Sequence, residues 1–294
     1  MYSVFHIEGG IGKNILATSV VSSLKTSDPE RKILVITAWP QVWFNNIDID
    51  RVYVLGQTAN FYKDFIYKKD VKIYRQDPYH TEDYILRKKH LIESWCELVG
   101  VKWNGIGPKL YFSPLELEYI KIKMLGGLNK PVLLLHTNGG PQNGRPYSWY
   151  RDLPYQNARE VVEYFKNDYH IYQIGYENQN FVEGCHRLTL DTREILASVL
   201  FSKKRLLIDS FSQHAAAALG LQSVVCWIGN DPSVLGYKSN INIVSQVPNA
   251  YDTLHSSYLE DYDIGGNPVQ YPYDTLNLFN STDIINILNE LHND

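Results

Sequence analysis

Short apolar runs alternate with amphipathic helical patterns along this chain, and that alternation restricts its fold more than any other feature. It is typical of βα units stacked on a parallel sheet, which defines an α/β fold. In the first half, the pattern predicts strands at 2–7, 32–37 and 51–55 and helices at about 13–24, 60–67 and 81–99. In the second half, it predicts strands at 131–136, 170–174, 205–208 and 223–228 and helices at 156–166, 191–202, 212–219 and 282–291.

The pattern restarts near the middle of the sequence, which points to two domains. At 294 residues the chain is longer than a usual single domain. The segment 126–131, GGLNKP, interrupts a helical stretch just before a new strand. We therefore predict one domain over 1–128 and another over 129–294, with a ligand cleft between them at the carboxyl ends of the two sheets.

Composition disfavours several classes of protein. The net charge of −4 provides no overall attraction to nucleic acid or anionic lipid, so any such contact needs a local patch. Cys96, Cys185 and Cys226 lie far apart without metal-binding spacing, and no cluster of metal ligands is evident. The sequence shows neither a secretory leader nor an apolar run of about 20 residues, so we expect a cytoplasmic protein without a transmembrane segment.

A glycine-rich turn, EGGIGKN, joins the first strand to the first helix at 8–14. Gly10 and Gly12 allow a ligand to approach the backbone, and the helix N-terminus offers unpaired N–H groups to an anion. A tight turn without a ligand is the alternative. The turn also looks like the P-loop of partitioning-type ATPases, but those sites need Ser or Thr where Asn14 stands, and a carboxylate where 37–40 has none.

A second candidate site lies in the segment 206–233, LLIDSFSQHAAAALGLQSVVCWIGNDPS. Here a strand ends at Asp209, and the turn of Ser210, Phe211 and Ser212 begins a helix whose first N–H groups can receive a diphosphate. His214, one turn later, could face the same ligand. Close packing of an alanine-rich helix, with His214 as a core residue, is the alternative.

The turn after the strand at 131–136 ends at the same edge of the second sheet. Its residues Asn138 and Gly139 are expected to face the ligand, followed by Arg145 and Arg151 as cations for a leaving nucleoside diphosphate. Either arginine could instead be an ordinary surface charge, and Arg151 could pair locally with Asp152.

In this order, the motifs resemble glycosyltransferase family 9, the heptosyltransferases, over roughly residues 1–235. The resemblance implies a GT-B fold of two Rossmann-like domains, an N-terminal acceptor domain and a C-terminal nucleotide-sugar donor domain. It leaves open whether the last helix packs back on the N-terminal domain. The implied reaction is inverting, metal-independent transfer of a sugar from a nucleoside diphosphate to a hydroxyl of a glycan or lipopolysaccharide-type saccharide, with no cofactor beyond the donor substrate. Gly175 and Glu177 resemble the family's loop beside the nucleotide base, although a solvated loop is equally consistent with them.

The chain departs from this family at one position that matters for mechanism. Family members carry an Asp directly after the glycine-rich turn as general base, whereas Lys13 or Asn14 stands there in this chain. Glu8 is the favoured substitute base, with His6 next, and Lys13 could bind donor phosphate or an anionic acceptor. The missing base keeps a nucleotide-binding protein without transferase activity as an alternative.

The stretch 61–91 interleaves lysines and arginines with tyrosines. Cations beside aromatic rings suit a phosphorylated glycan, and also single-stranded nucleic acid. A glycosyltransferase that modifies nucleic-acid bases is therefore a further alternative, though nucleic acid is not the favoured partner. Solvated faces of two helices would explain the same pattern, because several aspartates and glutamates dilute the positive charge.

Overall fold

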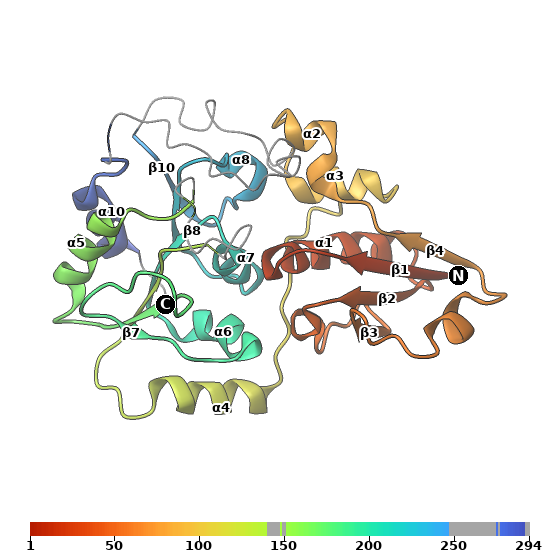
Figure 1. Cartoon of the computed structure of the whole chain (residues 1–294), viewed down its shortest axis with the longest axis horizontal. Helices are drawn as coiled ribbons and strands as arrows, with labels where there is room; N and C mark the ends of the chain where they lie inside the picture. The colour runs from red at the N-terminus through yellow and green to blue at the C-terminus, as the bar shows by residue number, and fades with distance from the viewer. Residues whose placement is uncertain (140–147, 149–150, 247–274, 276, 292–294) are drawn as a thin grey trace. The chain divides into compact units, whose positions relative to one another are not determined.

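The computed structural model describes residues 1–139, 148, 151–246, 275 and 277–291 (Figure 1). The chain divides into two compact units, Met1–Glu116 and Leu117–Asp294, and the division falls within helix α4, Pro114–Leu125. Each unit has its own parallel β-sheet flanked by helices, which confirms the predicted α/β fold class. None of the helices described is long and apolar enough to cross a membrane.

The sheet of the first unit has the strand order β3-β2-β1-β4, with all neighbours parallel. Its strands are β1 (Tyr2–Ile7), β2 (Lys32–Thr37), β3 (Arg51–Val54) and β4 (Val71–Tyr74). Helix α1, Ile11–Ser27, crosses from β1 to β2 and is buried along most of its length. Its hydroxyl residues bond to the segment 103–109. Thr18 Oγ1 accepts from the N–H of Lys109 at 2.9 Å, and Ser19 Oγ accepts from Trp103 Nε1 at 3.1 Å.

The connection from β4 to α4 differs from the predicted single helix at 81–99. The structure has η3 (Pro78–His80) and two separate helices, α2 (Glu82–Ile85) and α3 (Leu91–Leu98). Thr81 caps α2 by accepting from the N–H of Tyr84 at 3.4 Å. Arg87 then takes a left-handed backbone conformation with φ of 54°, which ends the helix although no Gly or Pro marks the break. The remaining short helical turns are η1 (Pro40–Trp43) and η2 (Tyr62–Ile66).

The sheet of the second unit has the order β10-β9-β8-β5-β6-β7, again all parallel. Its strands are β5 (Val132–His136), β6 (His170–Ile174), β7 (His186–Arg187), β8 (Lys204–Ile208), β9 (Val224–Trp227) and β10 (Ile241–Val244). Its helices and helical turns are α5 (Tyr155–Phe165), α6 (Thr192–Ser198), η4 (Val199–Phe201), α7 (Phe211–Ala218), α8 (Pro232–Leu235) and α10 (Ser281–Glu290).

The path of the chain through the second sheet creates a crevice between β5 and β8. From β5 the chain moves outward to β6 and β7, and it then returns to the other side of β5 to build β8, β9 and β10. The loops after β5 and β8 therefore leave in opposite directions, and ligands of open α/β sheets bind outside the carboxyl ends at such a point.

The last helix, α10, packs on the second unit's own sheet and on α5 (Figure 1). Ile284 and Leu288 are fully buried in the core that also contains Phe165. The ammonium group of Lys204, at the start of β8, donates hydrogen bonds to the backbone carbonyls of Leu288, Asn289 and Leu291. A cation thus satisfies carbonyls at the negative end of the helix dipole.

Candidate functional site

The carboxyl edge of the first sheet carries an ion pair between Lys13 and Asp77. Lys13 lies in the first turn of α1, and its Nζ is 2.6 Å from Asp77 Oδ2, in the loop after β4. The ammonium also lies over the rings of Tyr79 and Trp95, at 5.4 and 5.9 Å from their centroids. The side chain of Lys13 is only 8% exposed, whereas that of Asp77 is 35% exposed. The lysine is therefore held inside the protein, and the carboxylate can still be reached from solvent.

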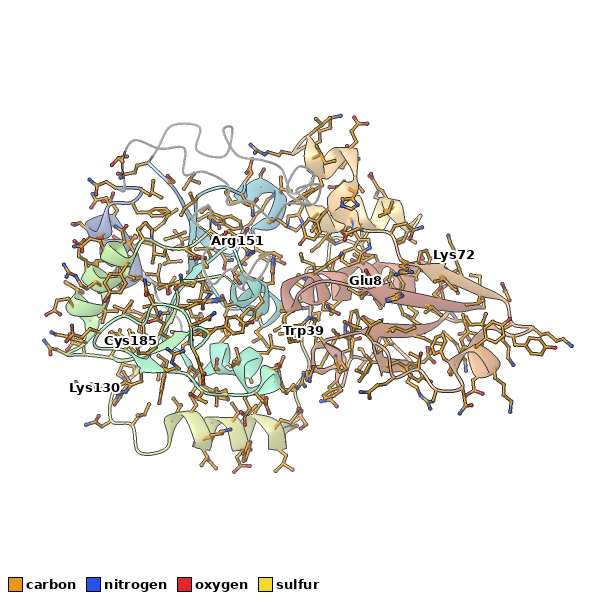
Figure 2. The ribbon with its side chains drawn as sticks, in the orientation of Figure 1. Glu8, Trp39, Lys72, Lys130, Arg151 and Cys185 are labelled. Carbon is orange, nitrogen blue, oxygen red and sulfur yellow. The ribbon has the colours of Figure 1, made fainter. Side chains whose placement is uncertain are left out.

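Glu8, directly after β1, forms a second and more exposed pair at this edge. Its Oε1 accepts from Arg75 Nη2 at 2.8 Å and from Arg75 Nε at 3.2 Å, and His6 Nε2 is 3.5 Å away. The hydrogen bonds and charge of Arg75 lower the pKa of Glu8. Trp39, labelled in Figure 2, donates from Nε1 to the carbonyl of Gly9 at 2.9 Å.

Asn14 has a different environment from the two charged residues beside it. It is fully buried, and its Oδ1 accepts from Thr37 Oγ1 at 2.7 Å and from Trp43 Nε1 at 3.1 Å. Its Nδ2 donates to the carbonyl of Gly10 at 3.1 Å. These bonds join α1 to β2 and η1, so the geometry favours a structural role for Asn14 over contact with a substrate.

The glycines of the turn after β1 differ in the space around them and in their backbone conformation. Gly9 has φ of +99°, and a Cβ there would lie 3.2 Å from Lys13 Cδ, so its absence leaves room for the buried lysine. Gly10 precedes α1 as its N-cap residue, and a Cβ on Gly10 would meet nothing within 4 Å. Gly12 lies within the first turn of the helix. The turn thus has open space around Gly10.

At the crevice of the second sheet, a buried hydrogen bond joins the end of β5 to the helix that follows β8. His136 Nδ1, at the end of β5, is 2.7 Å from Ser212 Oγ in the first turn of α7, and its ring lies 5.1 Å from that of Phe211. Burial lowers the pKa of His136 to about 4, and the nearby charge of Arg151 acts in the same direction. His136 is therefore neutral near pH 7.

Asp209, directly after β8, is buried. Asn230 Nδ2 donates to its Oδ2. Burial raises the pKa of Asp209, while the positive charge of Arg151 and the bond from Asn230 lower it. Arg151, labelled in Figure 2, is therefore close enough to Asp209 to influence its charge.

The loop after β5 holds Arg151 against the backbone of Gly139. A Cβ on Gly139 would lie only 3.1 Å from the guanidinium carbon, so a larger residue there would push the guanidinium away. Asp152 fixes the loop by accepting from the N–H groups of Gly139 and Ser148, both at 2.8 Å, and from Asn138 Nδ2 at 3.1 Å. Burial raises the pKa of Asp152, whereas these hydrogen bonds lower it.

Helix α7 presents its N-terminus to the crevice. Ser210 is the N-cap residue, and its side chain makes no capping hydrogen bond to the helix, so the helix's first N–H groups have no hydroxyl acceptor from it. His214 is buried further along α7 and contacts Tyr237 Oη at 2.9 Å through Nδ1. Burial and the charge of Asp209 raise the pKa of Tyr237 well above its usual value. His214 thus belongs to a hydrogen-bonded network behind the helix terminus.

The loop after β6 reaches the same region through a residue outside the predicted set. Gln179 Nε2 donates to the carbonyl of Gly139 at 2.8 Å, and its Oε1 accepts from the N–H of Tyr176 at 2.9 Å. A Cβ on Gly175 would lie 3.3 Å from the same Oε1. Glu177 is exposed in this loop. Gln179 therefore connects the loops after β5 and β6.

The structure divides the predicted site residues into two groups. Asn138, Gly139, Arg151 and 209–212 lie at the β5–β8 crevice, with Gly175 joined to them through Gln179. Glu8, Lys13, Gly10 and Gly12 belong to the first unit. Arg145 lies outside the described residues. Among the residues that are described, no group of three or more His, Cys, Asp or Glu side chains is arranged to hold a metal ion.

Sequence reasoning missed Asp77 as a candidate. In the sequence it is one of the aspartates that dilute the positive charge of 61–91, and the strand before it was not predicted. The segment VKIY, β4, pairs with β1, and the loop after it therefore ends beside the glycine-rich turn. Recognition of a strand at 71–74 would have placed Asp77 at the same sheet edge as Glu8.

Comparison with known proteins gives a consistent result for the fold. No protein-family model and no curated protein matches the sequence. Solved structures do match: the glycosyl transferase family 9 protein from Veillonella parvula has a TM-score of 0.69 at 13% identity, covering 99% of this chain and 96% of that one. The E. coli ADP-heptose lipopolysaccharide heptosyltransferase II has a TM-score of 0.66 at 12% identity, covering 89% and 97%. The E. coli heptosyltransferase WaaC with ADP has a TM-score of 0.57 at 11% identity, covering 91% and 100%.

These likenesses extend over nearly the whole chain, and at such identities they establish architecture. The resemblance to family 9 that the sequence motifs indicated is thereby confirmed at the level of the fold. With its two parallel sheets, the chain has the GT-B-like fold of solved glycosyltransferases.

Proposed function

We propose that this protein is a glycosyltransferase that moves a sugar from a nucleoside diphosphate to an acceptor hydroxyl. The observation that carries the proposal is the β5–β8 crevice, where the N-terminus of α7, with no side-chain cap from Ser210, and the guanidinium of Arg151 meet at a topological switch point. Both features favour a bound anion. Solved heptosyltransferases with the same fold include WaaC with ADP, a nucleoside diphosphate.

The donor diphosphate would lie against the first turn of α7. The N–H groups of Phe211 and Ser212 and the hydroxyl of Ser210 are the proposed donors, and Arg151 balances the charge of the leaving diphosphate. Gly139 and Asn138 would let the phosphates approach the loop after β5, and the loop of Gly175 and Glu177 would border the nucleotide base. The donor would need no metal and no further cofactor, because the protein's own cation and helix terminus fill that role.

The acceptor hydroxyl would be activated at the carboxyl edge of the first sheet. In the reaction its proton passes to a base, its oxygen bonds to the anomeric carbon, and the carbon–oxygen bond to the diphosphate breaks with its electron pair leaving on the diphosphate. Attack from the face opposite the leaving group gives inversion. A saccharide of the lipopolysaccharide type is the proposed acceptor, in keeping with the heptosyltransferases that share this fold.

Two carboxylates are candidates for the base. Arg75 lowers the pKa of Glu8, which weakens it as a proton acceptor. Asp77 is fixed by Lys13 and by the N–H of Tyr79, which donates to its Oδ1 at 3.1 Å, and it remains partly exposed. This rigidity favours Asp77. Transfer rates of the Asp77→Asn and Glu8→Gln variants would decide, and the base should be the residue whose amide lowers the rate about 100-fold or more.

We further propose that the protein works in the reducing environment of the cytoplasm. Cys96, Cys185 and Cys226 are all free thiols. Burial raises the pKa of Cys96 to about 11 and those of Cys185 and Cys226 to about 12, so these thiols resist oxidation. Such thiols are typical of a protein that never forms disulfides.

Donor binding can be tested by thermal shift with ADP, UDP, GDP and their sugar conjugates, and separately with ATP and Mg²⁺. We expect one nucleoside diphosphate to raise the melting temperature of the wild-type protein. Ser210→Asp should abolish that rise, because a carboxylate would occupy the helix terminus, whereas the matched Ser210→Ala variant should retain most of it.

Stabilisation by ATP with Mg²⁺ alone, unchanged in Ser210→Asp, would contradict the proposal and support a P-loop-like nucleotide-binding protein. The structure gives that alternative little support, because the lysine of the glycine-rich turn is buried and paired with Asp77. Binding of a nucleoside diphosphate sugar without transfer to any acceptor or to water would leave a binding protein without catalysis.

A further inference from the structure

The lysine- and tyrosine-rich stretch of the first unit separates into two parts with different charge environments. In the later part, Lys88 pairs with Glu82 at 2.7 Å, and Lys89 pairs with Asp83 and Glu97, both at 2.8 Å. In the earlier part, Lys63, Lys68 and Lys69 are exposed and form no ion pair within the described residues. Paired charges on a solvated surface therefore account for Lys88 and Lys89. They do not account for the earlier lysines.

The earlier part is anchored to the sheet by aromatic packing on its inner side. Phe61, Phe65 and Ile66 pack on a small core at the face of β1, β2 and β3. The ring of Phe65 lies 5.6 Å from that of Tyr2 and 5.2 Å from that of Phe61. These contacts fix the turn η2, while the neighbouring residues Tyr62, Lys63 and Tyr67 are exposed.

The outer side combines aromatic rings with ammonium groups. Tyr62 is 67% exposed and Tyr67 is 52% exposed, and their ring centroids are 6.3 Å apart. The Nζ of Lys68 lies 5.2 Å from the centre of the Tyr67 ring. We call these two tyrosines, with Lys63, Lys68 and Lys69, the 62–69 patch.

Two aspartates lie beside the 62–69 patch without cancelling its charge. Asp64 contributes to the electrostatic environment of Arg51, which is itself an exposed cation. Asp70 is exposed at the start of β4, where its backbone carbonyl accepts from the N–H of Tyr2 at 2.8 Å. With Arg51 included, the cations near the patch outnumber these two carboxylates.

We propose that the 62–69 patch docks this protein on the surface of an anionic lipid bilayer. Tyrosine rings and lysine side chains together suit the headgroup region, because the rings are amphipathic and the lysine stems can follow apolar surface while their charge stays in water. Each lysine near an anionic surface strengthens association about fivefold. The exposed aliphatic side chain of Ile73, 52% exposed, lies on the same face of β4 as Val71, which packs on the core under the patch.

Nucleic acid fits this surface less well than a bilayer does. Single-strand binding uses ring faces that are free to stack on bases, whereas the ammonium group of Lys68 already lies over the ring of Tyr67. An exposed isoleucine adds nothing to contact with a phosphate backbone but can enter the headgroup region. The inference does not depend on the proposed transferase activity, because it concerns only this surface.

Sedimentation with lipid vesicles tests the proposal directly. Full-length protein would be mixed with phosphatidylcholine vesicles, either pure or with about one third phosphatidylglycerol. We expect binding only to the anionic vesicles and a decrease of binding with added salt. The double variant Lys68→Gln, Lys69→Gln should bind about 30-fold more weakly.

Matched controls separate the patch from general charge. Lys88→Gln, Lys89→Gln removes the same charge from two adjacent lysines and should bind as the wild type does. Tyr62→Ser, Tyr67→Ser should also weaken vesicle binding, whereas the exposed pair Tyr155→Ser, Tyr176→Ser should not. Circular dichroism would verify that each variant is folded.

Equal losses in the patch and control variants, or no binding of the wild type to anionic vesicles, would overturn the proposal. Binding of a single-stranded oligonucleotide that is tighter than vesicle binding, and lost in Lys68→Gln, Lys69→Gln, would assign the patch to nucleic acid instead. Neither result bears on nucleotide binding at the β5–β8 crevice, which is measured separately.

Discussion

The carboxyl edges of the two sheets are built by the same sequence of strand, turn and helix, yet they are filled by different chemistry. At the first edge, full charges are paired: Lys13 with Asp77, and Glu8 with Arg75. At the second edge, a neutral imidazole, His136, joins strand and helix through Ser212, and the terminus of α7 lies beside it. One topology therefore supports two kinds of site.

The difference matters because a sheet edge becomes a functional site through its polar contents. An edge that presents accessible carboxylates can accept a proton. An edge that presents helix N–H groups and an arginine can hold an anion. Each edge could therefore serve one step of the proposed transfer.

The largest effect is expected from Asn14, the buried residue of the first edge. Asn14→Ala would leave the buried hydroxyl of Thr37 and the indole N–H of Trp43 without their acceptor. We expect a loss of roughly 4 kcal/mol in the free energy of unfolding, measured by urea denaturation. The exposed neighbour Glu8→Gln should be as stable as wild type. A stable Asn14→Ala protein with reduced transfer would return Asn14 to the catalytic candidates.

His136 should make the stability of the second edge depend on pH. Its pKa is lowered from 6.5 to about 4 in the folded protein, so the unfolded chain binds the proton more readily. The stabilising contribution is complete above about pH 6.5, declines as the pH falls, and levels off below about pH 4, a total of roughly 3 kcal/mol.

Urea denaturation of wild type and His136→Gln at pH 7 and pH 4.5 measures this contribution. The variant should lose less stability than wild type on acidification. Ser212→Ala keeps the buried imidazole and should retain the wild-type pH dependence, although it removes the hydrogen bond. An equal loss of unfolding free energy between pH 7 and pH 4.5 in wild type and His136→Gln would show that another group dominates the pH dependence of stability.

Two glycine substitutions test how much space the backbone has at the carboxyl edges of the two sheets. Gly139→Ala would place a Cβ 3.1 Å from the Arg151 guanidinium, whereas Gly10→Ala would meet nothing within 4 Å. We expect Gly139→Ala to weaken nucleoside diphosphate binding about tenfold, close to 1.4 kcal/mol, by displacing the arginine. Gly10→Ala should bind the same diphosphate like wild type. Isothermal titration calorimetry would measure the affinity of each variant. Equal affinities would show that Arg151 does not contact the diphosphate.

The smallest effect is expected from the exposed pair of the first edge. Arg75→Gln should leave the thermal unfolding temperature unchanged within error, because ion pairs in solvent contribute little to stability. It should still raise the pKa of Glu8 towards its ordinary value, since Arg75 is the main cause of the lowering. NMR titration of the Glu8 carboxyl would detect this, and an unchanged pKa would contradict the assigned cause.

The buried parts of both sheets could be predicted from sequence alone. The strands β1 and β2 have the predicted bounds, because continuous apolar runs identify them. Strand β4 was missed because an edge strand with exposed Lys72 and Ile73 has no such run. Strand β10, which is only partly buried, was likewise not predicted. The single helix expected at 81–99 is two helices, because the left-handed turn at Arg87 carries no sequence signal.

The site was predictable only where it follows directly from a strand end. The turn at 209–212 and the glycine turn at 138–139 were placed correctly at one crevice, because parallel strands fix where their loops emerge. The contact of Lys13 with Asp77 and the bridge made by Gln179 join segments far apart in the sequence. No local pattern encodes such pairs, and they became visible only with the strand order.

The hydrogen bonds of Lys204 to the end of α10 have a consequence for biosynthesis. Residues 281–291 supply the partners of this ammonium group and complete the core around Leu288 and Ile284, and the ribosome adds them after every strand of this sheet that the structure describes. The second unit therefore cannot complete its core until α10 has left the ribosome, and until then β8 lacks the helix that packs on it. The first unit is formed by Met1–Glu116, so it can fold while translation continues. Chaperones that shield nascent chains should accordingly contact the second unit for longer than the first.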